Sequence, residues 1–356
     1  MTSNIISLLR LVNQQIAGTT FKTAKEIVAW MGAMQAQDYS MAKWAVGVRL
    51  PGSTDARIEA AITSGEIIRT HVLRPTWHFV SPDDIYWMLE LAAPNILSAM
   101  RSRHKELELN EAVQKKSNAI IEKLLLGGNQ LTRDEIFAEL EQKKIATDNQ
   151  RGVHILMRAE LDGVICSGAT KGKQQTYALL AERVPKKETF RKEEALAELA
   201  KRYFTSHGPA TIQDFIWWSG LSVGDAKRGL EAVKSNFISE EIDSQIYWFA
   251  DNVVYSKKNE SLYLLPAYDE FVISYKDRIT ILTPESQAKA ISNNGIFWPV
   301  IVSNGKVIGT WKREQKKDSV IIETEFFTSR QKTTAAQCKN RAEQFGNFIG
   351  KEALIR

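Results

Sequence analysis

The sequence contains little cysteine and no long apolar run. Cys166 and Cys338 are its two cysteines, far apart and outside any cluster with the spacing of metal ligands. This excludes a disulfide framework and gives no support for a zinc site. No apolar stretch reaches the roughly 18 residues of a transmembrane helix. We therefore expect two reduced thiols, no metal, no cofactor and no membrane association.

The chain also lacks a strong charge of one sign and a secretory signal. Lys and Arg total 47 against 42 Asp and Glu, a net charge of +5. This small basic excess is compatible with a polyanionic partner but does not require one. Residues 1–4 lack the basic start and apolar core of a signal peptide, so we expect a cytoplasmic protein. A chain of 356 residues predicts roughly two to four domains.

Three helices and a β-ribbon are predicted at the start of the chain. The helices are expected over 5–16, 23–37 and 54–65, and the ribbon over 67–80. Apolar residues at helical spacing indicate the first helix, and Thr23 with Glu26 forms a capping box that opens the second. The second helix is predicted to end at Gln35 and Gln37, where a fraying end brings polar groups to solvent. This order of elements is typical of a winged helix.

The same order of elements recurs twice. The later capping pairs are Thr132 with Glu135 and Thr211 with Asp214. Two predicted strands around Lys171 and Lys173 give the second set a basic wing. From about residue 256 the sequence becomes rich in predicted strands, and Asn304-Gly305 is a hairpin signal. A curled sheet or small β-barrel, closed by a helix over 334–349, is expected there.

We therefore predict an α+β fold of tandem winged-helix units followed by a C-terminal β-barrel-like module. The predicted units are 1–105, which carries the glutamine pair, 106–185 with the basic wing, 186–255, and the β-barrel-like 256–356. Linkers are expected over 184–192 and 251–260. The capping threonines are unequally spaced, which excludes a solenoid of fixed period.

Five segments carry more specific patterns. In chain order they are Gln35-Ala36-Gln37, RTHVLRPTWHFV, GPATIQDFIWWSGL, LLPAYDEFVISYKDR and NGKVIGTWKR. Together, over nearly the whole chain, they resemble the AlkZ/YcaQ-type winged-helix DNA glycosylases of bacteria. The resemblance implies tandem winged helices followed by a β-barrel, in agreement with the repeated helix pattern. It also implies double-stranded DNA as the partner and base excision as the activity.

The resemblance places Gln35 and Gln37 in the catalytic pocket, as the Gln-x-Gln motif of the AlkZ-like branch. Asp38 follows one position too late for the Gln-x-Asp motif of the YcaQ-like branch. Family members of this kind excise alkylated purines, above all N7-alkylguanine. The resemblance leaves open which alkyl group is preferred, and whether bulky adducts or interstrand cross-links are released.

The residue types of the motif fit this chemistry. N7 alkylation puts a positive charge on the base, so the leaving group needs no protonation. A glutamine amide is not a base at neutral pH, but its carbonyl oxygen can accept a hydrogen bond from water and orient it. Two amides therefore favour hydrolysis of cationic lesions by a monofunctional enzyme. The next lysine is Lys43, so none adjoins the motif to form a covalent link to the sugar.

His78, Trp77 and Asp38 are further pocket candidates. His78 and Trp77 alternate along a predicted strand, and each is also compatible with a purely structural role. Asp269 and Glu270 invite a two-carboxylate mechanism. Adjacent residues on a strand face opposite sides, so we interpret this pair as structural residues or residues at the substrate rim.

Basic residues are expected to contact phosphates, and we predict a monomer that binds DNA mostly through the phosphate backbone. The candidates are Lys171, Lys173, Arg101, Arg103, Lys312 and Arg313. The alternative function is a non-enzymatic tandem winged-helix DNA-binding protein, such as a regulator or an adduct-sequestering resistance factor. The predicted helix over 54–65 offers only Arg57 and Glu59 as large polar readers, which disfavours sequence-specific readout. A protein-interaction scaffold fits the basic excess less well.

Overall fold

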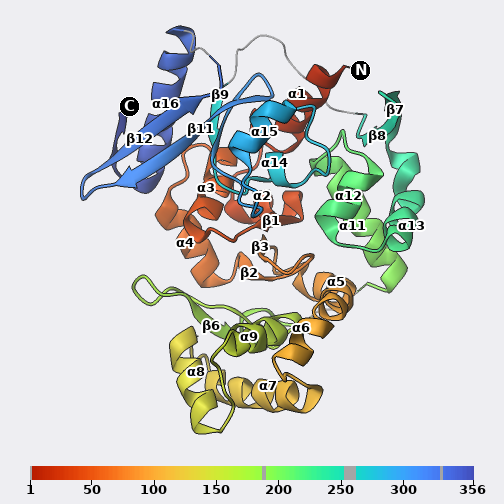
Figure 1. The fold of residues 1–356 in the computed structure, drawn as a ribbon, viewed down its shortest axis with the longest axis vertical. Helices are drawn as coiled ribbons and strands as arrows, with labels where there is room; N and C mark the ends of the chain where they lie inside the picture. The colour runs from red at the N-terminus through yellow and green to blue at the C-terminus, as the bar shows by residue number, and fades with distance from the viewer. Residues whose placement is uncertain (1, 187–189, 252–261, 329–331) are drawn as a thin grey trace.

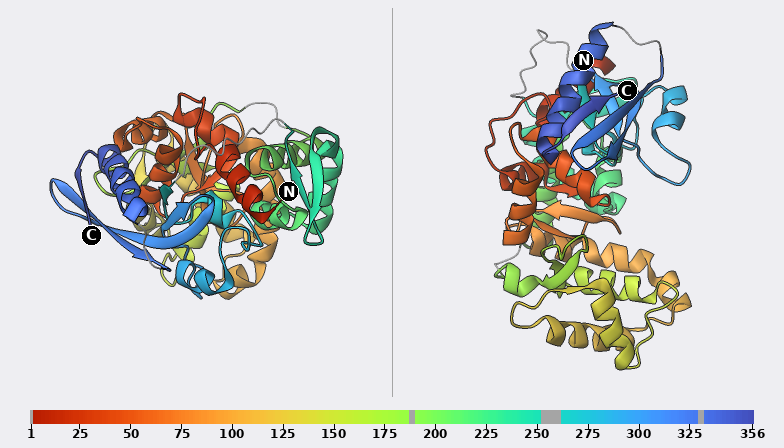
Figure 2. Two further views of the ribbon diagram at one scale, coloured as in Figure 1. Left: turned by 90° about the horizontal axis from the view of Figure 1, so that it is seen from above. Right: turned by 90° about the vertical axis from the view of Figure 1, so that its left-hand side faces the viewer.

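The computed structural model describes residues 2–186, 190–251, 262–328 and 332–356. The predicted linker over 251–260 lies almost entirely outside them, as does the middle of the one over 184–192. Figure 1 shows a broad upper body and a lower lobe, which is built from the yellow and yellow-green part of the chain. In the side view of Figure 2 the lobe extends the long axis of the molecule. Both ends of the chain meet in the upper body, where the N-terminal helices lie near the C-terminal sheet.

The first set of elements carries the glutamine pair. It consists of α1 (Ser3–Asn13), α2 (Ala24–Met31), β1 (Ala33–Gln35), α3 (Tyr39–Arg49), α4 (Asp55–Ser64), β2 (Ile68–His71) and β3 (Trp77–Val80). The strands form one sheet in the order β1-β3-β2, so the predicted ribbon is confirmed. The predicted capping box of Thr23 and Glu26 is also confirmed at the start of α2. This helix ends at Met31, where Gly32 follows with a positive φ of 76°.

The predicted helix end at the glutamines is therefore wrong. Gln35 is the last residue of strand β1, and a further helix, α3, follows directly. Asp38 caps α3 by accepting a hydrogen bond from the Met41 backbone N–H at 3.0 Å. The glutamine motif thus spans the end of a short strand and the bend that follows it, between two helices.

The second and third sets each combine helices with a small antiparallel sheet. The second contains α5 (Ile85–Ala99), α6 (Arg101–Glu106), α7 (Glu111–Leu125), β4 (Leu131–Thr132), α8 (Arg133–Gln142), α9 (Arg151–Leu161), β5 (Ile165–Ser167), β6 (Thr176–Leu179) and α10 (Leu180–Arg183). The third contains α11 (Lys192–Ser206), α12 (Ile212–Ser219), α13 (Val223–Val233), the 3₁₀ turn η1 (Lys234–Asn236), β7 (Ile238–Ile242) and β8 (Gln245–Phe249). The capping boxes predicted at Thr132 and Thr211 are both confirmed.

The C-terminal part is a curled sheet with helices packed around it. Its elements are β9 (Leu262–Leu265), α14 (Glu270–Ile273), α15 (Pro284–Ala290), β10 (Val300–Ser303), β11 (Lys306–Gln315), β12 (Ser319–Phe326), α16 (Lys332–Ile349) and β13 (Glu352–Ile355). The strand order β13-β12-β11-β10-β9 is that of an open half-barrel. Asn304 and Gly305 join β10 to β11 with φ of 48° and 77°, as the hairpin signal predicts. The predicted strand at Asp269 and Glu270 is wrong, because Asp269 caps the short helix α14.

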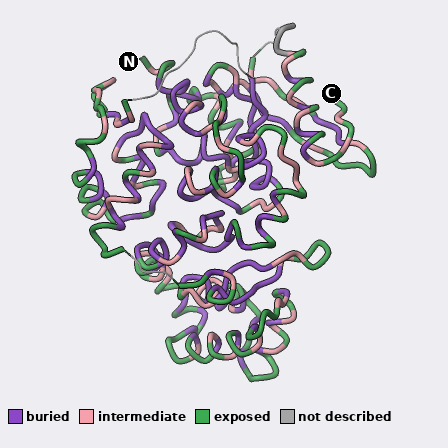
Figure 3. The backbone as a smooth tube through the Cα atoms, turned by 180° about the vertical axis from the view of Figure 1, so that it is seen from behind, coloured by how far each residue is buried: buried purple, intermediate pink, exposed green. Residues whose placement is uncertain are grey.

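One buried core joins the first set of elements to the C-terminal sheet and α16. Trp44 of α3 packs against Phe345 and Phe348 of α16, with ring centroids 5.2 and 5.1 Å apart. Arg49 at the end of α3 forms a fully buried ion pair with Asp269 at 2.8 Å. Figure 3 shows that buried backbone is concentrated in this body. Residues from both ends of the chain thus position the segment that carries the glutamines.

Cys166 and Cys338 are both buried and unbridged. Among the helices that the structure describes, none combines the length and the apolar character that a membrane span requires.

Candidate functional site

Gln35 lies at the end of β1 with only 6% of its surface exposed. It pairs with His78 across the sheet, so the two side chains lie on the same face. The Gln35 backbone N–H donates to Glu270 Oε1 at 2.6 Å, and its side-chain Oε1 accepts from Arg74 Nη2 at 3.0 Å. Two segments that are far apart in the sequence, the β2–β3 ribbon and the start of α14, therefore hold this glutamine.

Gln37 lies at a bend after the strand, two residues beyond Gln35, and is exposed. The Ala36 N–H donates to the Trp77 carbonyl at 2.6 Å. Arg69 in turn donates to the Ala36 carbonyl at 3.0 and 3.1 Å. The backbone between the two glutamines is therefore fixed by hydrogen bonds, while the Gln35 side chain is buried and Gln37 is open to solvent.

Arg74 determines which way the Gln35 amide points. A guanidinium group has only donors, so the atom of Gln35 that faces it is the carbonyl oxygen. That oxygen has a second lone pair, which can accept a hydrogen bond from a water molecule. Burial lowers the pKa of Arg74 from its usual value. An arginine with a lowered pKa is still a cation at neutral pH.

His78 is a fully buried, neutral imidazole. Its Nδ1 lies 2.9 Å from the Thr76 carbonyl oxygen, which can only accept, so the proton belongs on Nδ1. Nε2 is then an acceptor, and it has no partner among the described residues. Burial, and then the charge of Arg74, lower the pKa of His78 to about 3. His78 can therefore accept a hydrogen bond at this site but cannot serve as a proton donor at neutral pH.

The Glu270 carboxylate holds the glutamine segment through its hydrogen bond with the Gln35 backbone N–H. Besides the Gln35 N–H, its donors are Trp218 Nε1 at 3.2 Å and Ser274 Oγ, and His207 Nε2 lies 3.7 Å away. Burial opposes ionisation, but His207, the charge of Arg74 and the hydrogen bond from Ser274 hold the pKa of Glu270 below its usual range. Only 1% of Glu270 is exposed, so this carboxylate lies beneath the site rather than at its rim.

Sequence reasoning missed Arg74 and the link between Glu270 and Gln35. Arg74 and Glu270 both lie inside segments that resemble the glycosylase family, but the sequence patterns assigned neither of them a role at the glutamine site. Glu270 is followed by Phe271, Val272 and Ile273, and a carboxylate in such an apolar setting must find partners if it is buried. That setting is the signal that could have identified it.

Trp77 faces away from the Gln35 side chain, because it is the neighbour of His78 on β3 and side chains alternate along a strand. Its ring lies 4.5 Å from the Arg69 guanidinium carbon, and its Nε1 donates to Glu160 at 3.3 Å. Trp77 and Arg69 line a cavity of about 280 Å³ together with Tyr177 of the lower lobe. The structure therefore places Trp77 between the two parts of the molecule.

The predicted DNA-binding cations do not gather around the glutamines. Arg313 of β11 is the nearest of them, since its Nη2 lies 3.1 Å from Ser40 Oγ and 4.0 Å from Asp38. Lys312 is exposed on the other face of the strand. The remaining four lie in the second set, where Lys171 pairs with Glu135 at 2.6 Å, Arg103 pairs with Glu106 at 2.9 Å, Arg101 lines a pocket and Lys173 is exposed.

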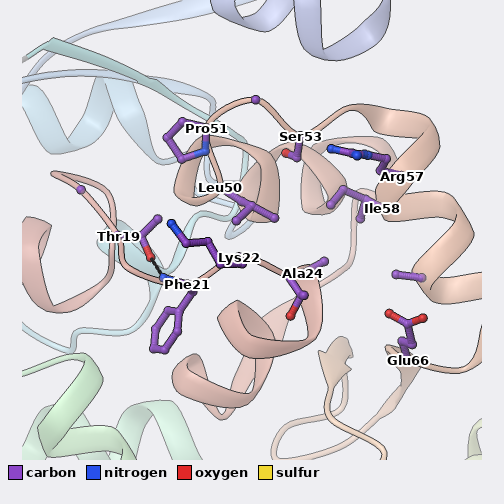
Figure 4. Close-up of a pocket in the computed structure, with 14 residues that line it drawn as sticks. Thr19, Phe21, Lys22, Ala24, Leu50, Pro51, Ser53, Arg57, Ile58 and Glu66 are labelled. Carbon is purple, nitrogen blue, oxygen red and sulfur yellow. Dashed lines mark hydrogen bonds between the residues drawn. The ribbon is translucent and has the colours of Figure 1, made fainter.

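A separate pocket of about 670 Å³ lies between α2, α4, the loop before α2 and the loop after α3. Figure 4 shows Lys22 and Leu50 on its wall, with Glu66 at the far edge. Arg57, from the helix considered above for base readout, also lines it. None of the predicted catalytic residues belongs to its lining, so this pocket is distinct from the glutamine site.

Comparisons with known proteins agree on one family. The family model described as "DNA glycosylase AlkZ-like" matches residues 28–348. A protein of Streptomyces sahachiroi named "Interstrand DNA cross-link repair glycosylase" is 24% identical over 333 residues, which cover 85% of each chain. The solved structure of Streptomyces sahachiroi DNA glycosylase AlkZ superimposes over the whole of both chains with a TM-score of 0.83 at 19% identity. That structure shares the fold of this chain.

Proposed function

Because the chain belongs to the AlkZ-like DNA glycosylase family and is thus a DNA glycosylase, we propose that it hydrolyses the N-glycosidic bond of alkylated purines. In this proposal Gln35 and Gln37 hold the attacking water against the anomeric carbon of the sugar. The observation that carries it is the fixed amide of Gln35, whose carbonyl oxygen is turned by Arg74 and has a lone pair to spare. Exposed Gln37, two residues further along the chain, supplies the second amide in this proposal.

The ionisation of the site supports a cationic leaving group of the N7-alkylguanine type. His78 is neutral, and Glu270 is a carboxylate whose oxygens are already occupied by donors. Neither residue is an acid that can protonate a departing base at neutral pH. An N7-alkylated purine needs no such acid, because it leaves as a neutral base. A normal purine would leave poorly from this site.

Lys43 supports a hydrolytic mechanism without a covalent enzyme–sugar intermediate. Its ammonium group lies 2.8 Å from Asp55 and 2.9 Å from Glu59. Although burial opposes it, these carboxylates raise the pKa of Lys43. An amine that stays protonated cannot attack the sugar. The product is then an intact abasic site, and borohydride should trap no adduct between the enzyme and DNA.

We extend the proposed substrates to bulky N7 adducts and cross-links. The relative from Streptomyces sahachiroi bears the name of a cross-link repair glycosylase, and the outer amide, Gln37, is exposed to solvent. An open outer wall leaves room for a large N7 substituent. Release of a single strand from a duplex cross-linked through N7 of guanine would establish this extension, and an intact cross-link after complete excision of N7-methylguanine would refute it.

We propose the sequence-based units 1–105, 106–185 and 186–255 as winged helices, followed by the module 256–356. Each of the first three contains a Thr-capped helix and a small antiparallel sheet, which is the composition of such a unit. We also propose that the protein works as a monomer in the cytoplasm, and that it contacts double-stranded DNA mainly through phosphates.

The decisive experiment is single-turnover excision of N7-methylguanine from a defined duplex. Gln35→Ala and Gln37→Ala should each lower the rate on the order of 10- to 1,000-fold, because each removes one ligand of the water. Affinity for the same duplex should change little, since phosphate contacts supply most of it. Gln287→Ala on exposed α15 is the matched control and should excise normally. Normal excision by the Gln35→Ala, Gln37→Ala double variant would remove the glutamines from the mechanism.

A further inference from the structure

An exposed tryptophan stands next to the glutamine site. Trp217 of α12 leaves 38% of its surface exposed, whereas its neighbour Trp218 is fully buried and donates to Glu270. Trp217 Nε1 donates to the Ile273 carbonyl at 2.8 Å, at the end of the helix α14 that Glu270 begins. A helix rises about 1.5 Å per residue, so this anchor lies only about 5 Å along α14 from Glu270. The exposed indole is therefore held near the carboxylate that binds Gln35.

Two cations lie over the ring of Trp217. Lys276 Nζ is 5.3 Å and the Arg278 guanidinium carbon 5.5 Å from the ring centroid. Arg278 is also 5.1 Å from the ring of Phe297, so two aromatic side chains hold it. Lys276 is exposed. The structure records no ion pair for either cation within the described part of the chain.

Arg278 is buried, but not all of its N–H donors have a hydrogen-bond acceptor. It exposes 8% of its surface. Its Nε donates to the Val272 carbonyl at 2.9 Å and its Nη1 to the Lys276 carbonyl at 3.4 Å. Its Nη2 has no partner among the described residues. Burial, with a smaller effect of the Arg74 charge, lowers the pKa of Arg278 to about 10 against the opposing charges of Asp214 and Asp277, so the cation is stabilised less here than in water.

Two other buried arginines of this protein, Arg49 and Arg10, are each paired with a carboxylate. Arg49 binds both oxygens of Asp269 at 2.8 Å, and Arg10 lies 3.7 Å from Asp214 while also donating to Thr280. Each of these buried guanidinium groups has its own carboxylate. A buried cation without an anion is unfavourable until one arrives. Arg278 therefore has the character of a ligand-binding residue, and its exposed neighbours indicate from which side the ligand comes.

We propose that Trp217, Lys276 and Arg278 bind one nucleotide of the DNA strand that enters the glutamine site. Lys276 and Arg278 hold its phosphodiester, and the exposed indole of Trp217 packs against an unstacked base. Arg278 Nη2 is closed off from solvent, so the exposed side chains of Trp217 and Lys276 shift when the phosphate engages it. The inference rests on the proposed function, because it takes DNA as the substrate. A glycosylase that extrudes a nucleotide leaves unstacked bases for such a platform to hold.

The test is equilibrium binding to two duplexes of the same sequence, one intact and one with a tetrahydrofuran abasic analogue. Trp217→Ala should weaken binding of the abasic duplex about 5- to 100-fold and of the intact duplex much less, because only the former presents an unstacked nucleotide. Trp217→Phe should restore most of the loss. Equal effects on both duplexes, or none on either, would overturn the stacking role.

The phosphate contact is tested by charge removal on both partners. Lys276→Gln should weaken binding and reduce the slope of log affinity against log salt by about 1. A neutral methylphosphonate at one position beside the abasic analogue should cause a similar loss in the wild type and no further loss in Lys276→Gln. If the binding loss caused by the methylphosphonate is as large in Lys276→Gln as in the wild type at every position tested, Lys276 does not contact a phosphate there and the phosphate site is refuted. Arg278→Gln should behave in the same way. If this variant melts at a lower temperature than the wild type, its binding loss can come from lost stability, and the result for the exposed Lys276 then tests the phosphate contact.

Two matched controls separate a local site from general damage. Phe190→Ala removes an aromatic side chain of 45% exposure elsewhere on the surface. Arg341→Gln removes a guanidinium group that lies 4.7 Å from the ring of Tyr263 and donates to a backbone carbonyl in the C-terminal part. Both should bind like the wild type. Wild-type protein that binds but never excises N7-methylguanine would refute the proposed function alone, whereas normal excision without the expected binding losses would refute this site alone.

Discussion

His78 is a histidine that the fold keeps uncharged. Its pKa falls from 6.5 to about 3 on burial, so at pH 5 the unfolded chain binds a proton that the folded chain does not. Stability therefore decreases as pH falls below about 6.5. Between pH 7.5 and 5.0, urea unfolding of the wild type should lose about 2 kcal/mol more than that of His78→Asn. Equal losses in both proteins would show that His78 is not the titrating group.

In the proposed mechanism Arg74 acts through Gln35, whose carbonyl oxygen it binds, and is a positioning residue. Arg74→Lys keeps the positive charge but lacks the fixed planar fork that holds the Gln35 oxygen. Single-turnover excision should slow about 10- to 100-fold, because a misplaced amide no longer aligns the water. The affinity for the lesion duplex, measured by fluorescence anisotropy, should stay within about 3-fold. A large loss of affinity with an unchanged rate would instead make Arg74 a DNA contact.

At the scale of elements, α11 and α13 are packed too closely for a methyl group at Gly229. A Cβ atom there would lie 2.6 Å from the backbone oxygen of Leu196. Gly229→Ala should destabilise the protein by about 1–3 kcal/mol. Gly224→Ala, on the same helix, meets nothing closer than 4.0 Å and should be neutral or slightly stabilising. Thermal melting of the two variants gives the comparison, and similar melting temperatures would contradict it.

Local patterns predicted the elements whose causes are local. The capping boxes at Thr23, Thr132 and Thr211 each depend on residues three positions apart, and all three are present. The helix α3 was missed because every residue from 41 to 49 is buried, which leaves no apolar stripe to detect. The strand at Gln35 was read as helix because its conformation depends on pairing with β3, a partner more than 40 positions away.

The same distinction applies to the site. The glutamines were identified through a family resemblance, whereas the contacts of Gln35 reach 39 and 235 positions along the chain, to Arg74 and Glu270. No periodicity in the sequence reports such contacts. Glu270 was also assigned to a strand, and that wrong assignment separated it from the motif it supports.

For the whole molecule, DNA binding should be independent of sequence and steeply dependent on salt. The net charge is only +5, so the proposed phosphate contacts depend on local basic groups such as Lys171 and Lys173 in the loop between β5 and β6. Charge reversal at Lys171 and Lys173 together should weaken binding on any sequence and reduce the salt slope by about 2. Filter binding at several salt concentrations on two unrelated duplexes provides the measurement. Binding of one duplex alone would favour a regulator's mode of recognition.

The core that joins both ends of the chain also governs when activity can arise during synthesis. Gln35 leaves the ribosome 235 residues ahead of Glu270, the carboxylate that binds its backbone. Until β9 to β12 and α16 follow, Trp44 and its neighbours have no partner surface and are open to chaperones or aggregation. A nascent or prematurely terminated chain therefore carries the glutamines without the support that positions them. Under the proposed mechanism, such a chain leaves no abasic sites in DNA.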